Sequence, residues 1–220
     1  MVASQVHLVR HGEVFNPDGV LYGRRSGFGL SELGKRMAQA AADDLVARHR
    51  SVAALFASPL QRTRESAQPI AAAFEIPTAI DDRLIEPTNH FEGMVMRVAL
   101  RSPANWPFMV NPMRPSWGEA YRSIADRMRA AIADAFNAVD TGDVVLVSHQ
   151  LPIWVAHLSL ERRPFMHDPR RRRCALSSIT TLSLIPDPRS ERTGQKIVVE
   201  TGYTDPAAAL AAEATDVGAV

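Results

Sequence analysis

Short apolar runs alternate along the chain with longer segments in which apolar residues recur every three or four positions. Buried strands are predicted where the apolar runs lie, at residues 5–9, 52–58 and 143–148. Amphipathic helices are predicted for the longer segments, at residues 31–49, 58–74 and 118–139. This alternation is typical of a three-layer α/β/α sandwich, with a mostly parallel, Rossmann-like sheet between two layers of helices.

The remaining segments complete a single domain over residues 1–203. Residues 78–86 predict a short strand and a turn, and two later runs predict the last strands, at residues 177–185 and 196–203. Residues 87–117 are rich in proline and have no clear period, so we expect an inserted segment that roofs one edge of the sheet. Residues 204–220 lack large apolar side chains, which predicts a loosely held tail.

Two serines stand where helix N-caps are expected. Ser31 precedes the first amphipathic segment. Ser58 is followed by a proline at the favoured first helical position and by Gln61 three residues on, as in a capping box. A helix N-terminus at a strand end favours anions, and Arg62 rather than Arg64 is expected to face that edge.

Composition narrows the class of protein. The 220 residues are 46% apolar and 22% charged, with a formal net charge of +1, as in a globular protein that does not bind nucleic acid. Cys174 is the only cysteine, which excludes an intramolecular disulfide and a cysteine-based zinc site. No signal-peptide pattern and no long apolar stretch is present, so we expect a cytoplasmic protein that does not associate with membranes.

Two of the predicted strands run directly into a histidine. His11 follows the first strand with Arg10 before it and Gly12 after it, and His149 follows the strand at residues 143–148. Parallel strands present their carboxyl ends at one edge of a sheet, so the two histidines are expected to meet there. Together with Arg62 they form a candidate site for an anion.

This set of residues suits phosphoryl transfer. Two arginines, Arg10 and Arg62, would balance the charge of a phosphoryl group and match its oxygens with paired hydrogen bonds. A neutral histidine at position 11 can attack phosphorus and form a phosphohistidine. His149 could donate to the equatorial oxygens, and Glu86 could protonate the leaving alcohol.

Four ordered motifs, "LVRHGEVFN", "SPLQRTRESA", "RLIE" and "VVLVSHQ", resemble the histidine phosphatase superfamily, which includes cofactor-dependent phosphoglycerate mutases and acid phosphatases. The resemblance implies His11 as the phosphorylated nucleophile and Glu86 as the proton donor. It also implies a phosphate pocket of Arg10, Arg62 and His149. Metal is not used by the family, and no metal ligand is expected here.

The resemblance extends to the substrate side of the site and includes departures. Asn16 would contact the transferred oxygens, and Tyr22 and Gly23 belong to a loop that reaches the substrate. Gln150 stands where the family has glycine, which would narrow the pocket or change its polarity. The segment after the expected donor is altered, so Glu92 is retained as an alternative to Glu86.

The expected activity is metal-independent hydrolysis of a small phosphorylated metabolite through a phosphohistidine, without a cofactor. The alternatives are a phosphoglycerate mutase, which would need 2,3-bisphosphoglycerate, and a weakly catalytic domain that binds a phosphorylated ligand. Beyond this substrate no partner is expected, except that a homodimer is left open. The basic run Arg170–Arg173 is interpreted as a solvated rim that attracts phosphorylated substrates.

Overall fold

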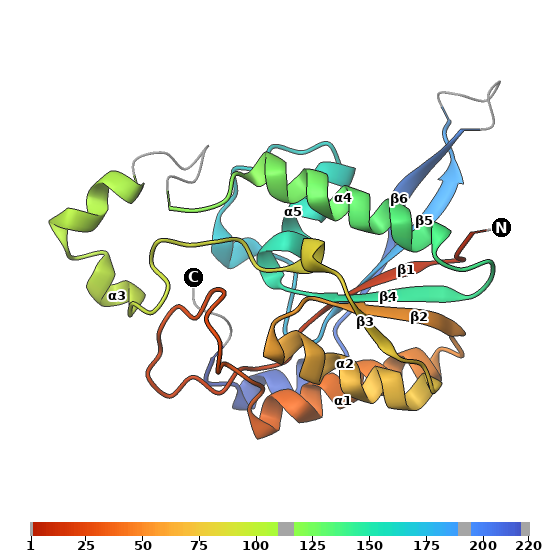
Figure 1. The fold of residues 1–220 in the computed structure, drawn as a ribbon, viewed down its shortest axis with the longest axis horizontal. Coiled ribbons are helices and arrows are strands. Elements are labelled where there is room, and N and C mark those ends of the chain that lie inside the picture. The colour runs from red at the N-terminus through yellow and green to blue at the C-terminus, as the bar shows by residue number, and fades with distance from the viewer. Residues whose placement is uncertain (1, 110–116, 189–194, 217–220) are drawn as a thin grey trace.

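The computed structural model describes residues 2–109, 117–188 and 195–216. Its centre is a six-stranded sheet in the order β3-β2-β4-β1-β5-β6 (Figure 1). The strands are β1 (Val6–Arg10), β2 (Val52–Ala57), β3 (Thr78–Ile80), β4 (Asp143–Ser148), β5 (Ile179–Pro186) and β6 (Lys196–Thr204). The strands β1 to β4 are parallel to one another, and β5 pairs antiparallel with both β1 and β6, which confirms the mostly parallel sheet.

Helices cover both faces of this sheet, as the alternating pattern predicts (Figure 1). One face carries α1 (Glu32–Ala47) and α2 (Gln61–Phe74), and the other carries α4 (Tyr121–Asn137) and α5 (Gln150–Leu160). A short helix, α3 (Met96–Ala99), lies in the roof segment. Short 3-10 helices occupy Asp82–Leu84, Pro103–Met109, Pro169–Arg171 and Ala208–Glu213. Within the described ranges, no helix combines the length and the apolarity needed to cross a membrane.

The central strand β1 is buried along its whole length, and its side chains contribute to two separate hydrophobic cores. Val6 and Leu8 pack with the apolar stripes of α4 and α5, whereas Val9 packs with α1 and α2. Side chains alternate between faces along a strand, so a run of successive apolar residues can serve both layers at once. Packing on both faces holds β1 in place, so the loop that follows it begins at a well-fixed residue.

The two predicted N-caps have different outcomes. The hydroxyl of Ser31 accepts a hydrogen bond from the backbone N–H of Gly34 at 2.9 Å, which confirms it as the N-cap of α1. The capping prediction for Ser58 is wrong, because α2 begins later, at Gln61, with no side-chain cap. The Ser58 hydroxyl instead hydrogen-bonds His149 from the neighbouring strand, a tertiary contact that replaces the local one.

The loop after β1 is pressed against the start of α1. A Cβ added to Gly12 would lie 2.3 Å from the carbonyl oxygen of Gly34, so only glycine allows this approach. The backbone N–H of Gly12 donates to the hydroxyl of Ser66 on α2 at 3.1 Å. These contacts hold the residue that follows His11 against both helices of one layer.

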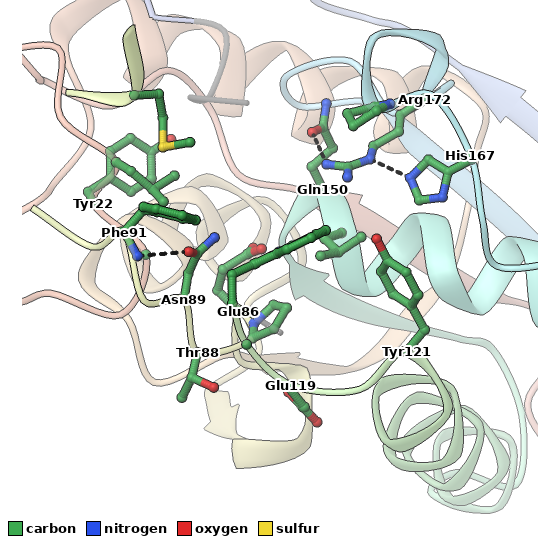
Figure 2. A pocket seen from close by; sticks show the side chains of 18 of the residues that line it. Tyr22, Glu86, Thr88, Asn89, Phe91, Glu119, Tyr121, Gln150, His167 and Arg172 are labelled. Carbon is green, nitrogen blue, oxygen red and sulfur yellow. Dashed lines mark hydrogen bonds between the residues drawn. The ribbon is translucent and has the colours of Figure 1, made fainter. Parts of the chain in front are cut away.

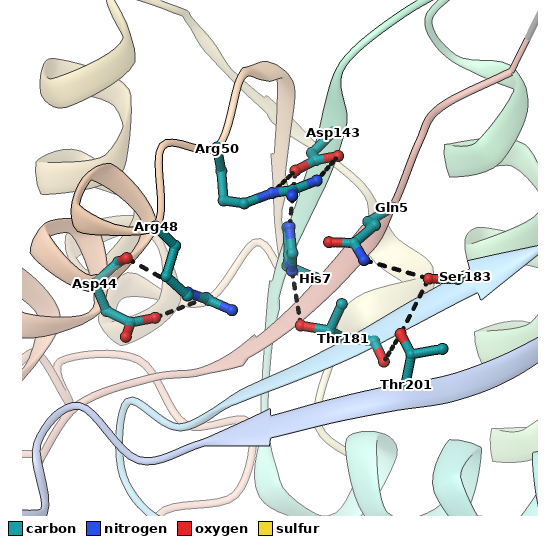
Figure 3. Close-up of polar contacts among 9 residues, drawn as sticks. All are labelled: Gln5, His7, Asp44, Arg48, Arg50, Asp143, Thr181, Ser183 and Thr201. Atoms are coloured by element: carbon teal, nitrogen blue, oxygen red, sulfur yellow. Dashed lines mark hydrogen bonds and ion pairs between the residues drawn. The ribbon is translucent and has the colours of Figure 1, made fainter.

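A buried polar network lies near the opposite end of the sheet (Figure 3). The His7 ring contacts Asp143 through Nε2 at 3.1 Å and Thr181 through Nδ1 at 3.0 Å. Arg50 donates to both carboxylate oxygens of Asp143, at 2.6 and 2.9 Å. Burial acts to raise the pKa of Asp143, but the hydrogen bonds from His7 and Arg50 outweigh it and hold that pKa below its ordinary value.

The C-terminal segment contacts the domain over residues 204–216, and the expectation of a loosely held tail stays a prediction. Ala207 is buried, and the backbone N–H groups of Thr215 and Asp216 donate to the Glu13 carboxylate at 2.6 and 3.2 Å. Small side chains allow close packing, which a search for large apolar residues does not detect. Residues 217–220 of the predicted tail and 110–116 of the predicted roof lie outside the described residues.

Candidate active site

His11 and His149 meet at the carboxyl end of the sheet. They follow β1 and β4, which are parallel neighbours with Arg10 paired to Ser148. Their ring centroids are 5.2 Å apart, with an angle of 64° between the ring planes. The prediction that the two histidines lie together at one edge is confirmed.

The ring of His11 has a defined orientation. Nδ1 lies 2.7 Å from the carbonyl oxygen of Gly12, a group that can only accept, so Nδ1 carries the proton. Nε2 is therefore left with its lone pair. Burial, followed by the charges of Arg62 and Arg10, holds the pKa of His11 well below its ordinary value. At neutral pH the ring is uncharged and can act as a nucleophile.

Two buried guanidinium groups surround this ring. Arg62 from the first turn of α2 donates to the carbonyl oxygen of Gly23 at 2.8 Å and stacks over the Tyr22 ring, 4.7 Å from its centroid. Arg10 donates to the carbonyl oxygen of Cys174 at 2.6 Å. The printed partners of Arg62, a backbone carbonyl and a neutral ring, carry no charge, so its positive charge is available to an anion beside His11.

His149 connects the histidine pair to a carboxylate. Its Nε2 lies 2.8 Å from the Ser58 hydroxyl, and its Nδ1 lies 3.5 Å from Oε2 of Glu86. Burial and the charge of Arg62 hold the pKa of His149 well below its ordinary value. Among the described residues, His149 Nδ1 and Arg62 Nε are buried with no hydrogen-bond partner. Buried polar atoms of this kind can be completed by a bound water or ligand.

The structure separates the two candidate proton donors. Glu86 lines the cavity beside His149, and burial raises its pKa, although the charge of Arg62 opposes this shift. The Glu86 backbone is fixed by Arg24, which donates to its carbonyl oxygen at 2.5 Å. Glu92 is not among the cavity-lining residues, and its carboxylate accepts from the backbone N–H of Asn89 at 3.2 Å. The geometry therefore favours Glu86.

A cavity of about 420 Å³ opens in front of these groups (Figure 2). Tyr22, Gly23 and Gln150, which the resemblance assigns to substrate contact or to a changed pocket, all line it. Its walls are largely apolar, with several large side chains from the loop after β1, the roof and α5: Leu21, Phe91, Met96, Leu100, Trp117 and Leu151. The roof segment thus contributes to this site, as its predicted position implies.

Asn16 lies outside this cavity. Its side-chain amide donates to the carbonyl oxygen of Val20 at 3.0 Å and to the carboxylate of Asp216 at 2.6 Å. It lines an adjacent cavity of about 720 Å³ that the C-terminal segment helps to enclose. The assignment of Asn16 to the transferred oxygens stays a prediction.

The interpretation of the basic run as a solvated rim is wrong for Arg172. Arg170, Arg171 and Arg173 are exposed, but Arg172 is half-buried and lines both cavities. It donates to Nε2 of His167 at 2.8 Å and to Oε1 of Gln150 at 3.1 Å. No sequence signal distinguishes the third arginine of four, because its direction depends on the 3-10 turn at Pro169–Arg171.

Within the described part of the chain, no group of three or more His, Cys, Asp or Glu side chains is arranged to hold a metal ion.

Comparisons with known proteins identify the family of the chain. The profile of the histidine phosphatase superfamily (branch 1) matches residues 6–192. "Uncharacterized protein Rv0525" of Mycobacterium tuberculosis is 47% identical over 208 residues, 93% of this chain and 98% of that protein. Phosphoserine phosphatase 1 of Hydrogenobacter thermophilus is 30% identical over 160 residues, 70% of this chain and 74% of that one. The mycobacterial glucosyl-3-phosphoglycerate phosphatase Rv2419c superposes with a TM-score of 0.66 at 25% identity, covering 82% of this chain and 90% of that one.

Proposed function

The chain belongs to the histidine phosphatase superfamily, and from that premise we propose that it hydrolyses a small phosphomonoester through a phosphohistidine at His11. Two of the matching proteins are named as phosphatases of phosphoserine and of glucosyl-3-phosphoglycerate, both small phosphorylated metabolites. We propose that turnover needs neither a metal ion nor 2,3-bisphosphoglycerate. Phosphatase activity is supported by the family, and the roles of the individual residues are part of the proposal.

In the first step the lone pair on Nε2 of His11 attacks phosphorus, and the bond from phosphorus to the ester oxygen breaks. Arg10 and Arg62 neutralise the negative charge on the equatorial oxygens. The leaving oxygen takes a proton from Glu86, whose raised pKa favours the protonated form. The products of this step are a free alcohol, phosphohistidine and the Glu86 carboxylate.

In the second step water attacks the phosphohistidine. The Glu86 carboxylate takes a proton from this water, and the bond between Nε2 and phosphorus breaks. Inorganic phosphate leaves, and His11 and Glu86 return to their starting protonation states. One carboxyl group thus serves first as acid and then as base.

The orientation of the His11 ring gives this mechanism its strongest support. A ring held by Nδ1 against a backbone carbonyl, kept neutral by burial and by two arginines, has one nitrogen ready for attack. The same positive charges would bind the phosphoryl dianion. A histidine with only a structural role would gain nothing from this arrangement.

The test is a phosphatase assay on the full chain over a panel of phosphomonoesters, with and without a metal chelator. His11→Asn should lose phosphate release from every substrate that the wild-type protein hydrolyses. His49→Asn, at an exposed position with φ of 54°, is the matched control and should keep full activity. Undiminished activity in His11→Asn, or loss of activity with chelator, would contradict the proposal.

A further inference from the structure

Arg172 places a positive charge inside the candidate active site that the proposed steps do not use. Its guanidinium lies between Gln150 and His167, with the remaining nitrogen on the side of the cavity (Figure 2). Both partners are neutral acceptors. Within the described residues, no carboxylate lies at ion-pair distance from this guanidinium, although the charge of Glu86 is near enough to act on its pKa.

The neighbouring arginines behave differently. Arg170 pairs with Asp168 at 3.0 Å, and Arg173 pairs with Glu200. Burial lowers the pKa of Arg172, because the charged guanidinium is less well solvated here than in water. A half-buried cation without an anionic partner is expensive, and proteins keep such groups where a ligand supplies the opposite charge.

The two neutral partners position the guanidinium rather than neutralise it. His167 contacts the carbonyl oxygen of Phe165 through Nδ1 at 2.6 Å, so its Nε2 is the acceptor for Arg172. Gln150 accepts through Oε1 on the other side. A guanidinium has five N–H donors, and two are used here, so three are left for a ligand. Gln150 stands where the resemblance places glycine, and its side chain thus holds the guanidinium of Arg172 in position.

The surroundings of Arg172 further define the ligand. The roof side of the same cavity is mostly apolar, with side chains such as Phe91, Met96 and Trp117. This wall favours an apolar body in the part of the substrate that leaves with the ester oxygen. A single guanidinium matches one negative charge and the two oxygens of a carboxylate, whereas a second phosphate would need about two cations.

We propose that Arg172 binds a carboxylate on the leaving group, so that the preferred substrate is a phosphomonoester in which an apolar body joins the phosphate to a carboxylate. The inference rests on the proposed phosphatase function and adds the substrate class. Arg10 and Arg62 would hold the transferred phosphoryl group, and Arg172, which lines the same cavity as Arg10, would hold the carboxylate.

The test compares substrates that differ only in this charge. The three positional isomers of carboxybenzyl phosphate are each assayed beside the corresponding methyl ester, which keeps the apolar body and removes the negative charge. For at least one isomer, wild-type kcat/KM should favour the acid by about 10- to 100-fold, as for a hydrogen-bonded ion pair. In Arg172→Gln this preference should fall to about one, and Arg172→Lys should keep part of it.

Arg171→Gln is the matched control, because it removes the same charge from the next residue, which is exposed and lines neither cavity. It should keep the wild-type preference. Equal kcat/KM for acid and ester in the wild-type protein overturns the proposal. An equal loss for both substrates in Arg172→Gln also overturns it, because Arg172 would then bind the transferred phosphate. A bisphosphate analogue preferred over every carboxylate isomer overturns the choice of carboxylate.

A binding measurement keeps this inference separate from the proposed catalysis. Calorimetry compares carboxybenzyl phosphonates, which cannot be hydrolysed, with their methyl esters, on wild-type protein and Arg172→Gln. Tighter binding of an acid by the wild-type protein alone supports the carboxylate site even where no ester is hydrolysed, which would refute only the phosphatase. Equal affinity for acid and ester, or binding of neither, overturns the site itself.

Discussion

Replacement of Glu86 by glutamine removes the proposed proton donor and changes little else. Gln has nearly the same volume, and the backbone at position 86 stays fixed by Arg24. Because Glu86 is not the nucleophile, the variant should still bind substrate and form phosphohistidine. What it lacks is a proton for the leaving oxygen, so the size of its defect should depend on how much the leaving group needs that proton.

The expected magnitude follows from this dependence. An alkoxide leaving group is a strong base, and loss of a positioned general acid should lower kcat/KM about 10²- to 10⁴-fold, or roughly 3–5 kcal/mol of barrier. p-Nitrophenolate is a stable anion at neutral pH and needs little protonation, so its ester should lose much less. The location of Glu86, with Oε2 3.5 Å from Nδ1 of the buried His149, places a carboxyl group beside the histidine pair.

The assay measures kcat/KM for an alkyl phosphate and for p-nitrophenyl phosphate with wild-type protein, Glu86→Gln and Glu92→Gln. Glu92→Gln keeps an oxygen that can accept from the Asn89 N–H, so it should retain both activities. A large loss with the alkyl ester and a small loss with the nitrophenyl ester identifies Glu86 as the acid. Equal losses for both esters, or the leaving-group effect in Glu92→Gln instead, would refute the assignment.

The pH profile gives a second readout of the same variant. Burial raises the pKa of Glu86, and the first step needs its protonated form, so activity on the alkyl ester should fall as pH rises past that pKa. His11 must be neutral, and its lowered pKa moves the acidic limb well below its usual position. The ratio of wild-type to Glu86→Gln kcat/KM cancels the titration of the substrate. That ratio should therefore decrease with rising pH, and a constant ratio contradicts the role.

Two further predictions concern stability. Gly12→Ala would bring a Cβ within 2.3 Å of the backbone oxygen of Gly34. In a denaturant titration it should lower the free energy of unfolding by roughly 3 kcal/mol, the upper end for overpacking. An unchanged denaturation midpoint would show that the loop can move away. Asp143→Asn should cost about 3 kcal/mol because it breaks a buried ion pair, whereas Asp126→Asn at an exposed pair should cost under about 0.5 kcal/mol. Since the folded pKa of Asp143 is depressed, its contribution is present above about pH 4 and lost as pH falls through the folded pKa, so the gap between wild type and Asp143→Asn should narrow in acid.

The pattern of the sequence was sufficient for the layers of the fold and for the meeting of the two histidines. Period-2 and period-3.6 signals depend on local burial, and parallel strands bring their carboxyl ends to one edge without any knowledge of detailed contacts. The cap at Ser31 was also predictable, because its partner Gly34 lies three residues away. Local chemistry decides these features.

Features that depend on distant contacts were not predictable. The Ser58 hydroxyl binds His149 rather than its own helix, and the two residues are 91 positions apart. Thr215 is held by Glu13 through a backbone N–H, which no composition of the tail reveals. Arg172 is one of four successive arginines, and only the turn before it directs its side chain to the cavity. Each of these is a polar contact that exists only after the chain has folded.

Trapping the covalent intermediate is the decisive test for phosphorylation of His11. The full chain is mixed with p-nitrophenyl phosphate, quenched in base within the first turnover, digested and mapped by mass spectrometry under conditions that preserve phosphohistidine. We expect one phosphoryl group on His11 of the wild-type protein. When the quench is delayed until the substrate is consumed, this group should disappear, because water hydrolyses the phosphohistidine. The corresponding peptide of His11→Asn should carry no phosphoryl group. Hydrolysis that proceeds with no phosphorylated His11 at any time, or with the phosphoryl group on another residue, would contradict it.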